Sequence, residues 1–140
     1  MPKRIPPPEA AEFLAQGWSY VDVRSVPEFE QGHPTGAYNV PWRHMQDGGM
    51  SPNADFQRVI EAHFPRDAKL VIGCKSGGRS LQAATMLEAA GYTSVVDMCG
   101  GYHGETDPFG RPVVPGWAAA GLPTETAALG RTWPELERKK

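Results

Sequence analysis

The sequence predicts an α/β fold with a mainly parallel sheet. Short apolar segments typical of buried strands alternate with segments of helical periodicity between residues 6 and 99. The connections between these segments are short, which favours right-handed crossovers between neighbouring parallel strands. The composition, with 40% apolar and 21% charged residues in a chain of 140, is that of one ordinary globular domain with its own core.

The first half of the chain predicts two strands and three helical segments. Residues 6–17 begin with prolines and end at a glycine, as a short helix does. Residues 18–24 are rich in aromatic and β-branched side chains and predict a strand. "PEFEQG" then predicts a helical turn and "AYNVP" a short strand. A helix is expected over residues 51–64, with one face formed by Phe56, Val59, Ile60 and His63.

The second half predicts two further strands and the longest helix, over residues 68–74, 94–99 and 79–92 respectively. Between residues 100 and 123, ten of the 24 residues are Gly or Pro, which is typical of loops. We expect a single domain over residues 1–126. A C-terminal tail over residues 127–140 is expected to end either in a short charged helix, over 134–139, or in disordered chain.

Composition and charge exclude several classes of function. A net charge of −2 and a pI near 6.1 give no basic face for nucleic acid. No apolar run approaches the ~20 residues that span a bilayer, and no hydrophobic segment follows the first cations as in a secretory signal. Two cysteines make no disulfide framework, so a reducing, cytoplasmic location is expected. No metal site is expected from the spacing of His33, His44, His63 and His103.

The segment "VIGCKSGGRSLQAA", residues 71–84, places Cys74 where a predicted strand ends and a helix follows. Ligands of open α/β sheets bind beyond the carboxyl ends of the strands. Gly77 and Gly78 permit backbone angles with which several N–H groups can point at one spot, a concavity suited to an anion. The expected anion is the Cys74 thiolate, with Lys75 and Arg79 as nearby cations.

No single group is strong enough to ionise Cys74 at pH 7, so the whole loop must act together. A free thiol with a pKa of about 8.5 is only about 3% ionised at pH 7. A helix N-terminus offers ~0.3–1 kcal/mol, which is less than the equivalent of one pH unit. The alternative is that Cys74 is a small apolar side chain packed at a strand end. The adjacent Gly-Gly and the two cations favour a reactive thiol.

The segment "CKSGGRS" on a strand-to-helix turn resembles the active-site loop of rhodanese-type sulfurtransferases. "YVDVRSVPEFEQGHPTGAYNVP", residues 20–41, is similar to the N-terminal signature of that family. "VVDMCGGYHG" followed by "WAAAGLP" is similar to its C-terminal signature. The resemblance implies a three-layer rhodanese-like domain, with a mainly parallel five-stranded sheet and helices on both faces.

The resemblance also implies a mechanism. Cys74 is the catalytic nucleophile and carries a persulfide. The donor is thiosulfate or a persulfide, the acceptor is cyanide or the thiol of a small molecule or protein, and no cofactor is required. A two-step relay of this kind requires an activated thiolate and donors that face the departing anion. The implied substrate-binding loop consists of Lys75, Ser76, Gly77, Gly78, Arg79 and Ser80.

Two other functions are compatible with such a loop. The first is a non-catalytic rhodanese-like module that carries sulfur or binds a partner protein. Such modules often lack the cysteine, which is present here. The second is a cysteine phosphatase, whose loop places five residues between Cys and Arg. Here there are four, "KSGG", and Gly73 stands where those phosphatases usually carry His.

Two residues that end the predicted strand 18–24, Asp22 and Arg24, are expected near the same sheet edge as Cys74. We interpret them as supporting residues that tie the strand to neighbouring loops by hydrogen bonds. Cys99 ends the strand predicted after the long helix and is expected to open onto this edge too. It either packs as an ordinary apolar side chain or resolves a Cys74 persulfide by forming a disulfide.

Residues 104–116, "GETDPFGRPVVPG", depart from the family pattern, because compact rhodanese domains have less chain between the Gly-Gly and the Trp. We interpret this segment as an inserted surface loop. One hypothesis is that Phe109 or Arg111 folds over the pocket and narrows the choice of donor.

Overall fold

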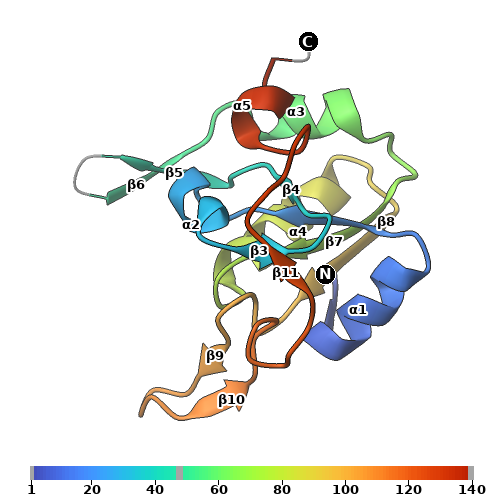
Figure 1. Cartoon of the computed structure of the whole chain (residues 1–140). Helices are drawn as coiled ribbons and strands as arrows, with labels where there is room; N and C mark the ends of the chain where they lie inside the picture. Colours follow the sequence, from blue (N-terminus) through green and yellow to red (C-terminus); the bar gives the residue numbers. More distant parts are fainter. Residues whose placement is uncertain (1, 47–48, 139–140) are drawn as a thin grey trace.

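The computed structural model describes residues 2–46 and 49–138, and a five-stranded sheet forms its centre (Figure 1). The strand order is β1-β8-β7-β2-β4, and all adjacent pairs are parallel. This confirms the predicted fold class. The strands are β1 (Lys3–Ile5), β2 (Ser19–Asp22), β4 (Tyr38–Asn39), β7 (Lys69–Gly73) and β8 (Ser94–Met98).

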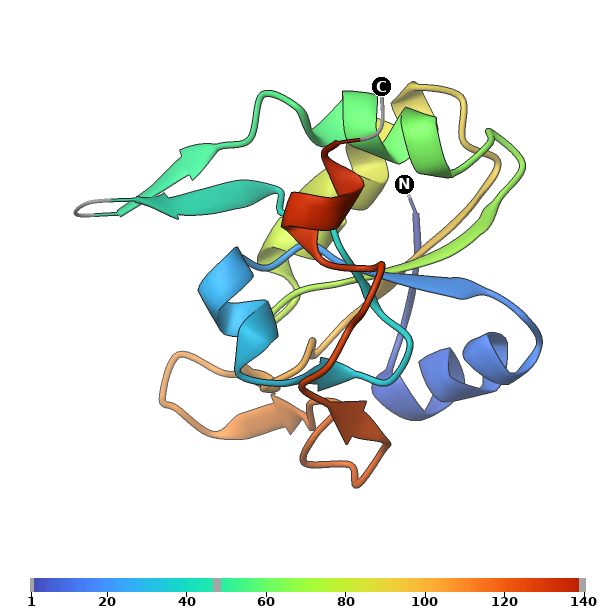
Figure 2. The ribbon, with the colours of Figure 1, turned by 45° about the horizontal axis from the view of Figure 1, so that its top comes forward.

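Helices on both faces of the sheet give the three layers (Figure 2). Side chains alternate along β7, so that Leu70 and Ile72 enter one apolar cluster and Val71 the other. The first cluster is covered by α3 (Phe56–His63), α4 (Gly78–Ala89) and α5 (Trp133–Leu136). The second is covered by α1 (Pro7–Ala15), Phe29 of α2 (Val26–Glu30), and Trp117. In the described parts of the chain, no helix is long and apolar enough to cross a membrane.

Three antiparallel pairs of short strands surround the main sheet, and the sequence did not predict them. They are β3 (His33–Pro34) with β11 (Thr124–Glu125), β5 (Arg43–Gln46) with β6 (Gly49–Pro52), and β9 (Glu105–Thr106) with β10 (Pro112–Val114). The third pair forms a hairpin within the predicted insertion 104–116. In Figure 1 this hairpin projects from the lower side of the molecule.

Several predicted boundaries differ from the observed ones. The predicted helix over 51–64 begins only at Phe56, because residues 51 and 52 belong to β6. β1 was not predicted, since its three residues lie between prolines and carry no strand pattern of their own. In the tail, α5 begins at Trp133, one residue before the expected start at 134. Trp133 and Leu136 are buried in the first core cluster.

Candidate active site

Cys74 follows the last residue of β7, which is the middle strand of the sheet, and is only 1% exposed. Two groups approach its sulfur: the Gly77 amide nitrogen at 3.1 Å and the Ser80 Oγ at 3.4 Å from Sγ. Gly77 precedes α4 with a φ of 114°, a conformation that glycine adopts without strain. The Cys74 thiol donates to the Ser80 Oγ, and the Ser80 hydroxyl donates to the Gly77 carbonyl. The loop therefore presents one N–H, that of Gly77, to the sulfur at the start of a helix.

A second pair of glycines holds the beginning of this loop. Gly100 and Gly101 both have positive φ, and a Cβ on Gly101 would collide with the backbone of Cys74 and Lys75. The amides that follow donate to the loop: Tyr102 N–H to the Cys74 carbonyl at 2.7 Å and His103 N–H to the Lys75 carbonyl at 2.9 Å. Close backbone contact thus fixes where Cys74 leaves the sheet.

Asp22 and Arg24 lie at the same sheet edge. Asp22 pairs with Gly73 across β2 and β7, and its carboxylate accepts from Arg24 Nη2 at 2.7 Å. Both residues are 1% exposed. The Arg24 guanidinium also donates to the Gly32 carbonyl at 2.7 Å and lies 4.4 Å from the centroid of the Tyr102 ring. The pair ties β2 to Gly32 and to Tyr102, and its supporting role in the reaction stays a prediction.

Tyr20 contacts Gly73 immediately before the cysteine. Its hydroxyl occupies the space that a Cβ on Gly73 would need. The hydroxyl is buried and has no hydrogen-bond partner among the described residues. Burial and the Asp22 charge raise the pKa of Tyr20 well above its usual 10.0. A glycine is therefore required at position 73 because a tyrosine side chain lies against it.

Arg79 forms an ion pair with Glu28, which joins α4 to α2. Its two terminal nitrogens lie 2.8 and 3.0 Å from the two carboxylate oxygens. Burial alone would raise the pKa of Glu28, but hydrogen bonds from Arg79 and Ser25 outweigh it and lower this pKa to about 2. Glu28 thus neutralises the positive charge of Arg79 beside the loop, and both terminal nitrogens of Arg79 face Glu28.

The open side of the loop carries positive charge. Lys75 and Ser76 are exposed, as are Gly78 and the His103 side chain. Partial burial and the charges of Arg24 and Lys75 lower the pKa of His103 from its usual 6.5. We name Lys75 and His103 together the mouth of the site. Sequence patterns gave no reason to place His103 there, because it reaches the loop through the turn after β8.

The structure contradicts one expectation about neighbouring residues and leaves another untested. Phe109 is 83% exposed and Arg111 is exposed, so neither side chain folds over Cys74, and that hypothesis is wrong. Cys99 is partly buried, and burial raises the pKa of its thiol above the usual 9.0. If Gly77 carried a Cβ, that atom would lie 3.8 Å from the Cys99 Cα. Cys99 therefore lies on the side of Gly77 that faces Arg4. Its role in resolving a persulfide stays a prediction.

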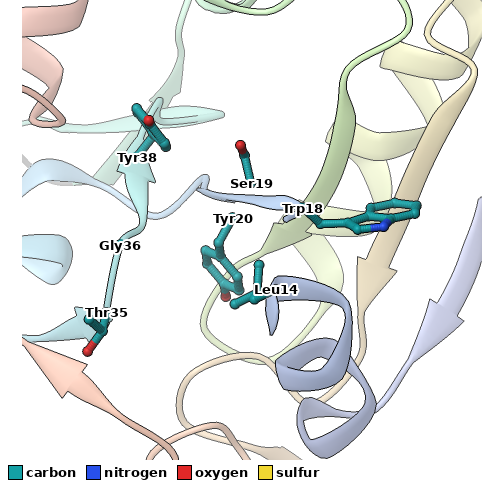
Figure 3. A pocket seen from close by; sticks show the side chains of 7 residues that line it. All are labelled: Leu14, Trp18, Ser19, Tyr20, Thr35, Gly36 and Tyr38. Carbon is teal, nitrogen blue, oxygen red and sulfur yellow. The ribbon is translucent and has the colours of Figure 1, made fainter. Parts of the chain in front are cut away.

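The cavities in the described structure lie elsewhere. One of about 270 Å³ opens at the amino end of β2 (Figure 3) and is lined by Leu14, Trp18, Ser19, Tyr20, Thr35, Gly36 and Tyr38. A second of about 290 Å³ shares Leu14 and Thr35 with it. Neither lining contains a cysteine, histidine or charged side chain, and β2 and β7 are parallel. Because Ser19 is at the amino end of β2, the first cavity opens away from the sheet edge that carries Cys74.

Comparisons with known proteins agree with this geometry. The family model described as "Rhodanese-like domain" matches residues 7–105. The chain is 40% identical over 125 residues to "Thiosulfate sulfurtransferase 16, chloroplastic" of Arabidopsis thaliana, covering 89% of this chain and 94% of that protein. It is 32% identical over 126 residues to "Thiosulfate sulfurtransferase GlpE" of Haemophilus influenzae, covering 89% and 96% of the two chains.

A solved structure shows the same fold over nearly its full length. The crystal structure of Rv0390 from M. tuberculosis superposes with a TM-score of 0.74 at 29% identity, covering 89% of this chain and 98% of that one. Family model, relatives and fold agree on one family. The chain therefore belongs to the rhodanese-like domain family and is an enzyme of the sulfurtransferase class.

Proposed function

We propose that the chain moves a sulfane sulfur from thiosulfate or a persulfide donor to cyanide or to the thiol of a small molecule or protein, with Cys74 as nucleophile. One observation carries the proposal: the Gly77 amide lies 3.1 Å from the Cys74 Sγ at the carboxyl end of the middle strand. The names of the relatives support thiosulfate as a donor. A cytoplasmic location stays a prediction from the sequence.

The first half-reaction loads the enzyme. The Cys74 thiol loses its proton to solvent, and the resulting sulfur anion attacks the outer sulfur of thiosulfate. A bond forms between Sγ and that sulfur, the S–S bond of thiosulfate breaks, and sulfite leaves with the electron pair. The Gly77 amide stabilises the sulfur anion, since a donor fixed in advance needs no reorganisation during the reaction. Once the thiol proton has left, the Ser80 hydroxyl turns its own proton from the Gly77 carbonyl to the sulfur anion.

The second half-reaction unloads the enzyme. The acceptor anion attacks the outer sulfur of the persulfide, and Cys74 departs as the thiolate from which the cycle began. The mouth formed by Lys75 and His103 attracts the anionic donor and faces the leaving sulfite. Because Cys74 is buried, the donor presents a terminal sulfur while the body of a large donor stays outside.

The test is replacement of the nucleophile. Cys74→Ser should reduce thiocyanate formation from thiosulfate and cyanide by at least about a thousandfold, because the hydroxyl cannot carry the sulfur. Cys99→Ser is the matched control and should keep most of the activity. Mass spectrometry after thiosulfate treatment should find one added sulfur on the peptide with Cys74. Substantial turnover by Cys74→Ser would disprove the mechanism.

The same measurements decide between the proposal and its alternatives. A binding-only module would show neither thiocyanate formation nor a persulfide on Cys74. A cysteine phosphatase would hydrolyse p-nitrophenyl phosphate in a parallel assay and leave thiosulfate intact. The four-residue spacing between Cys74 and Arg79, together with the Arg79–Glu28 pair, disfavours the phosphatase, because that guanidinium is already bound to a carboxylate.

A further inference from the structure

An ion pair between β1 and β8 lies next to Gly77 of the cysteine loop. Arg4 of β1 and Asp97 of β8 are paired across the parallel ladder, and Arg4 Nε lies 2.7 Å from Asp97 Oδ2. The Asp97 side chain is fully buried, while that of Arg4 is 35% exposed. Arg4 lies outside residues 7–105, the part of the chain that matches the family model.

Arg4 also contacts the loop itself. Its Nη2 donates to the Gly77 carbonyl at 3.3 Å, and a Cβ on Gly77 would come within 2.8 Å of that nitrogen. The same carbonyl accepts from the Ser80 hydroxyl and from the Leu81 amide, each at 3.3 Å. Gly77 is the residue whose amide faces the Cys74 sulfur. Arg4 therefore packs against the backbone that presents the sulfur-binding N–H.

Asp97 lies next to the second sulfur-binding group. The Ser80 hydroxyl is close enough to stabilise the Asp97 carboxylate, although Oδ1 accepts no regular hydrogen bond from the described residues. Burial raises the pKa of Asp97, and the interactions with Ser80 and Arg4 offset part of this rise. A buried carboxylate separated from the sulfur by one hydroxyl would repel a sulfur anion unless a cation compensated it.

Charged groups reach the loop from every element around it, and most of them are paired. Arg79 and Glu28 compensate each other between α4 and α2, as Arg24 and Asp22 do at the end of β2, beside neutral Tyr20. Cys99 and Glu105 add weaker interactions with Arg4. Lys75 and His103 stand at the mouth. Of these three ion pairs, the one between Arg4 and Asp97 is the pair that donates to the Gly77 carbonyl, and its carboxylate also interacts with the Ser80 hydroxyl.

We propose that Arg4 is a positioning residue for the sulfur: it compensates the buried Asp97 charge and fixes Gly77, so that the Gly77 amide and the Ser80 hydroxyl keep facing Cys74. This inference rests on the proposed function and adds to it a contribution from outside the matched domain. The role is electrostatic as well as steric, so removal of the Asp97 charge should repair much of the damage caused by removal of Arg4.

The experiment compares Arg4→Met, Arg4→Lys, Asp97→Asn and the double variant Arg4→Met/Asp97→Asn. Lys3→Met is the matched control, because Lys3 is an exposed cation on the same strand. Arg4→Met should lower kcat roughly tenfold with KM changed less than about twofold, and should move the acid limb of the pH profile to higher pH. The double variant should return the acid limb to its original position and recover most of kcat. Arg4→Lys should keep the pH profile and lose part of kcat.

A second readout does not depend on sulfur transfer. The rate of Cys74 alkylation by iodoacetamide as a function of pH, in a Cys99→Ser background, should show the same shift for Arg4→Met and the same rescue. If wild type is alkylated normally but transfers no sulfur, the proposed function fails while this inference is still tested by the alkylation profiles. Unchanged profiles for Arg4→Met, or equal parallel losses of stability and activity without rescue by Asp97→Asn, would overturn the inference.

Discussion

Under the proposed function, the charge on a single imidazole at the mouth of the site affects donor binding. His103 stands beside Lys75, and the lowered pKa of His103 makes this imidazole neutral at pH 7. At lower pH it gains a proton and becomes a second cation at the mouth. An anionic donor then meets two positive charges instead of one.

We therefore expect the KM for thiosulfate to fall as the pH drops below the usual imidazole pKa of 6.5, by roughly two- to fivefold, the range for an exposed charge interaction. His103→Gln should lose this decrease and match the wild type at pH 8, where the imidazole is neutral in any case. Steady-state kinetics from pH 5 to pH 8 would measure the effect. An identical pH dependence of KM in the variant would remove His103 from the mouth.

Residues of the site differ in how far the sequence could predict them. Cys74, Gly77 and Ser80 are found from the local pattern, because a strand end, a glycine-rich turn and a helix start place them together. Arg4 and Asp97 could not be paired from the sequence, since their contact depends on the register between two strands separated by 93 positions. A carboxylate within the apolar segment "SVVDMC" was the available signal.

The Arg79–Glu28 pair acts at the scale of whole elements, because it joins the short helix α2 to the start of α4. Its pH dependence has a defined sign. The Glu28 pKa is lowered to about 2, so the pair stabilises the fold above the usual Glu value of 4.5, and this stabilisation is lost as the pH falls toward 2. The shift corresponds to about 3 kcal/mol as an upper value.

Glu28→Gln should accordingly lower the free energy of unfolding by up to about 3 kcal/mol at pH 7, and by roughly half as much or less at pH 3. Glu30→Gln, an exposed position on the same helix, should change it by less than about 0.5 kcal/mol at either pH. Urea denaturation of both variants at the two pH values gives the comparison. A deficit for Glu28→Gln of the same size at pH 3 as at pH 7 would contradict the ion-pair explanation.

At the scale of elements, the long helix and the apolar strands were predictable because their own residues carry the periodicity. The short strands were not. β3 pairs with β11 across about 90 residues, and each has two residues, too few to show any alternation. β1 likewise is a strand because it pairs with β8, and not because the residues "KRI" favour strand structure.

The whole molecule depends on the C-terminal tail, which covers one face of the core. Trp133 is 7% exposed, its ring centroid lies 5.4 Å from that of His44, and the His63 Nε2 lies 2.8 Å from the Leu136 carbonyl oxygen. α5 thereby joins the same apolar cluster as α3 and α4. Within the described residues 127–138, the tail thus contributes α5 to the folded core.

Trp133→Ala should destabilise the protein by about 3–5 kcal/mol, because it leaves a large cavity in the core. Leu129→Ala in the same tail should have little effect, since Leu129 is 93% exposed. Thermal or urea unfolding of the two variants measures the difference. A loss of less than about 1 kcal/mol for Trp133→Ala would mean that the tail does not support the core.

The depth of the thiol has a consequence for how the enzyme withstands oxidants between turnovers. An empty Cys74 is screened by its own loop, so peroxide has little access to drive it to the sulfinic acid. In the proposed persulfide form, the outer sulfur lies about 2 Å beyond Sγ, on the side from which the donor arrived. Cellular reductants would therefore react with the outer sulfur first, while the Sγ of Cys74 stays buried.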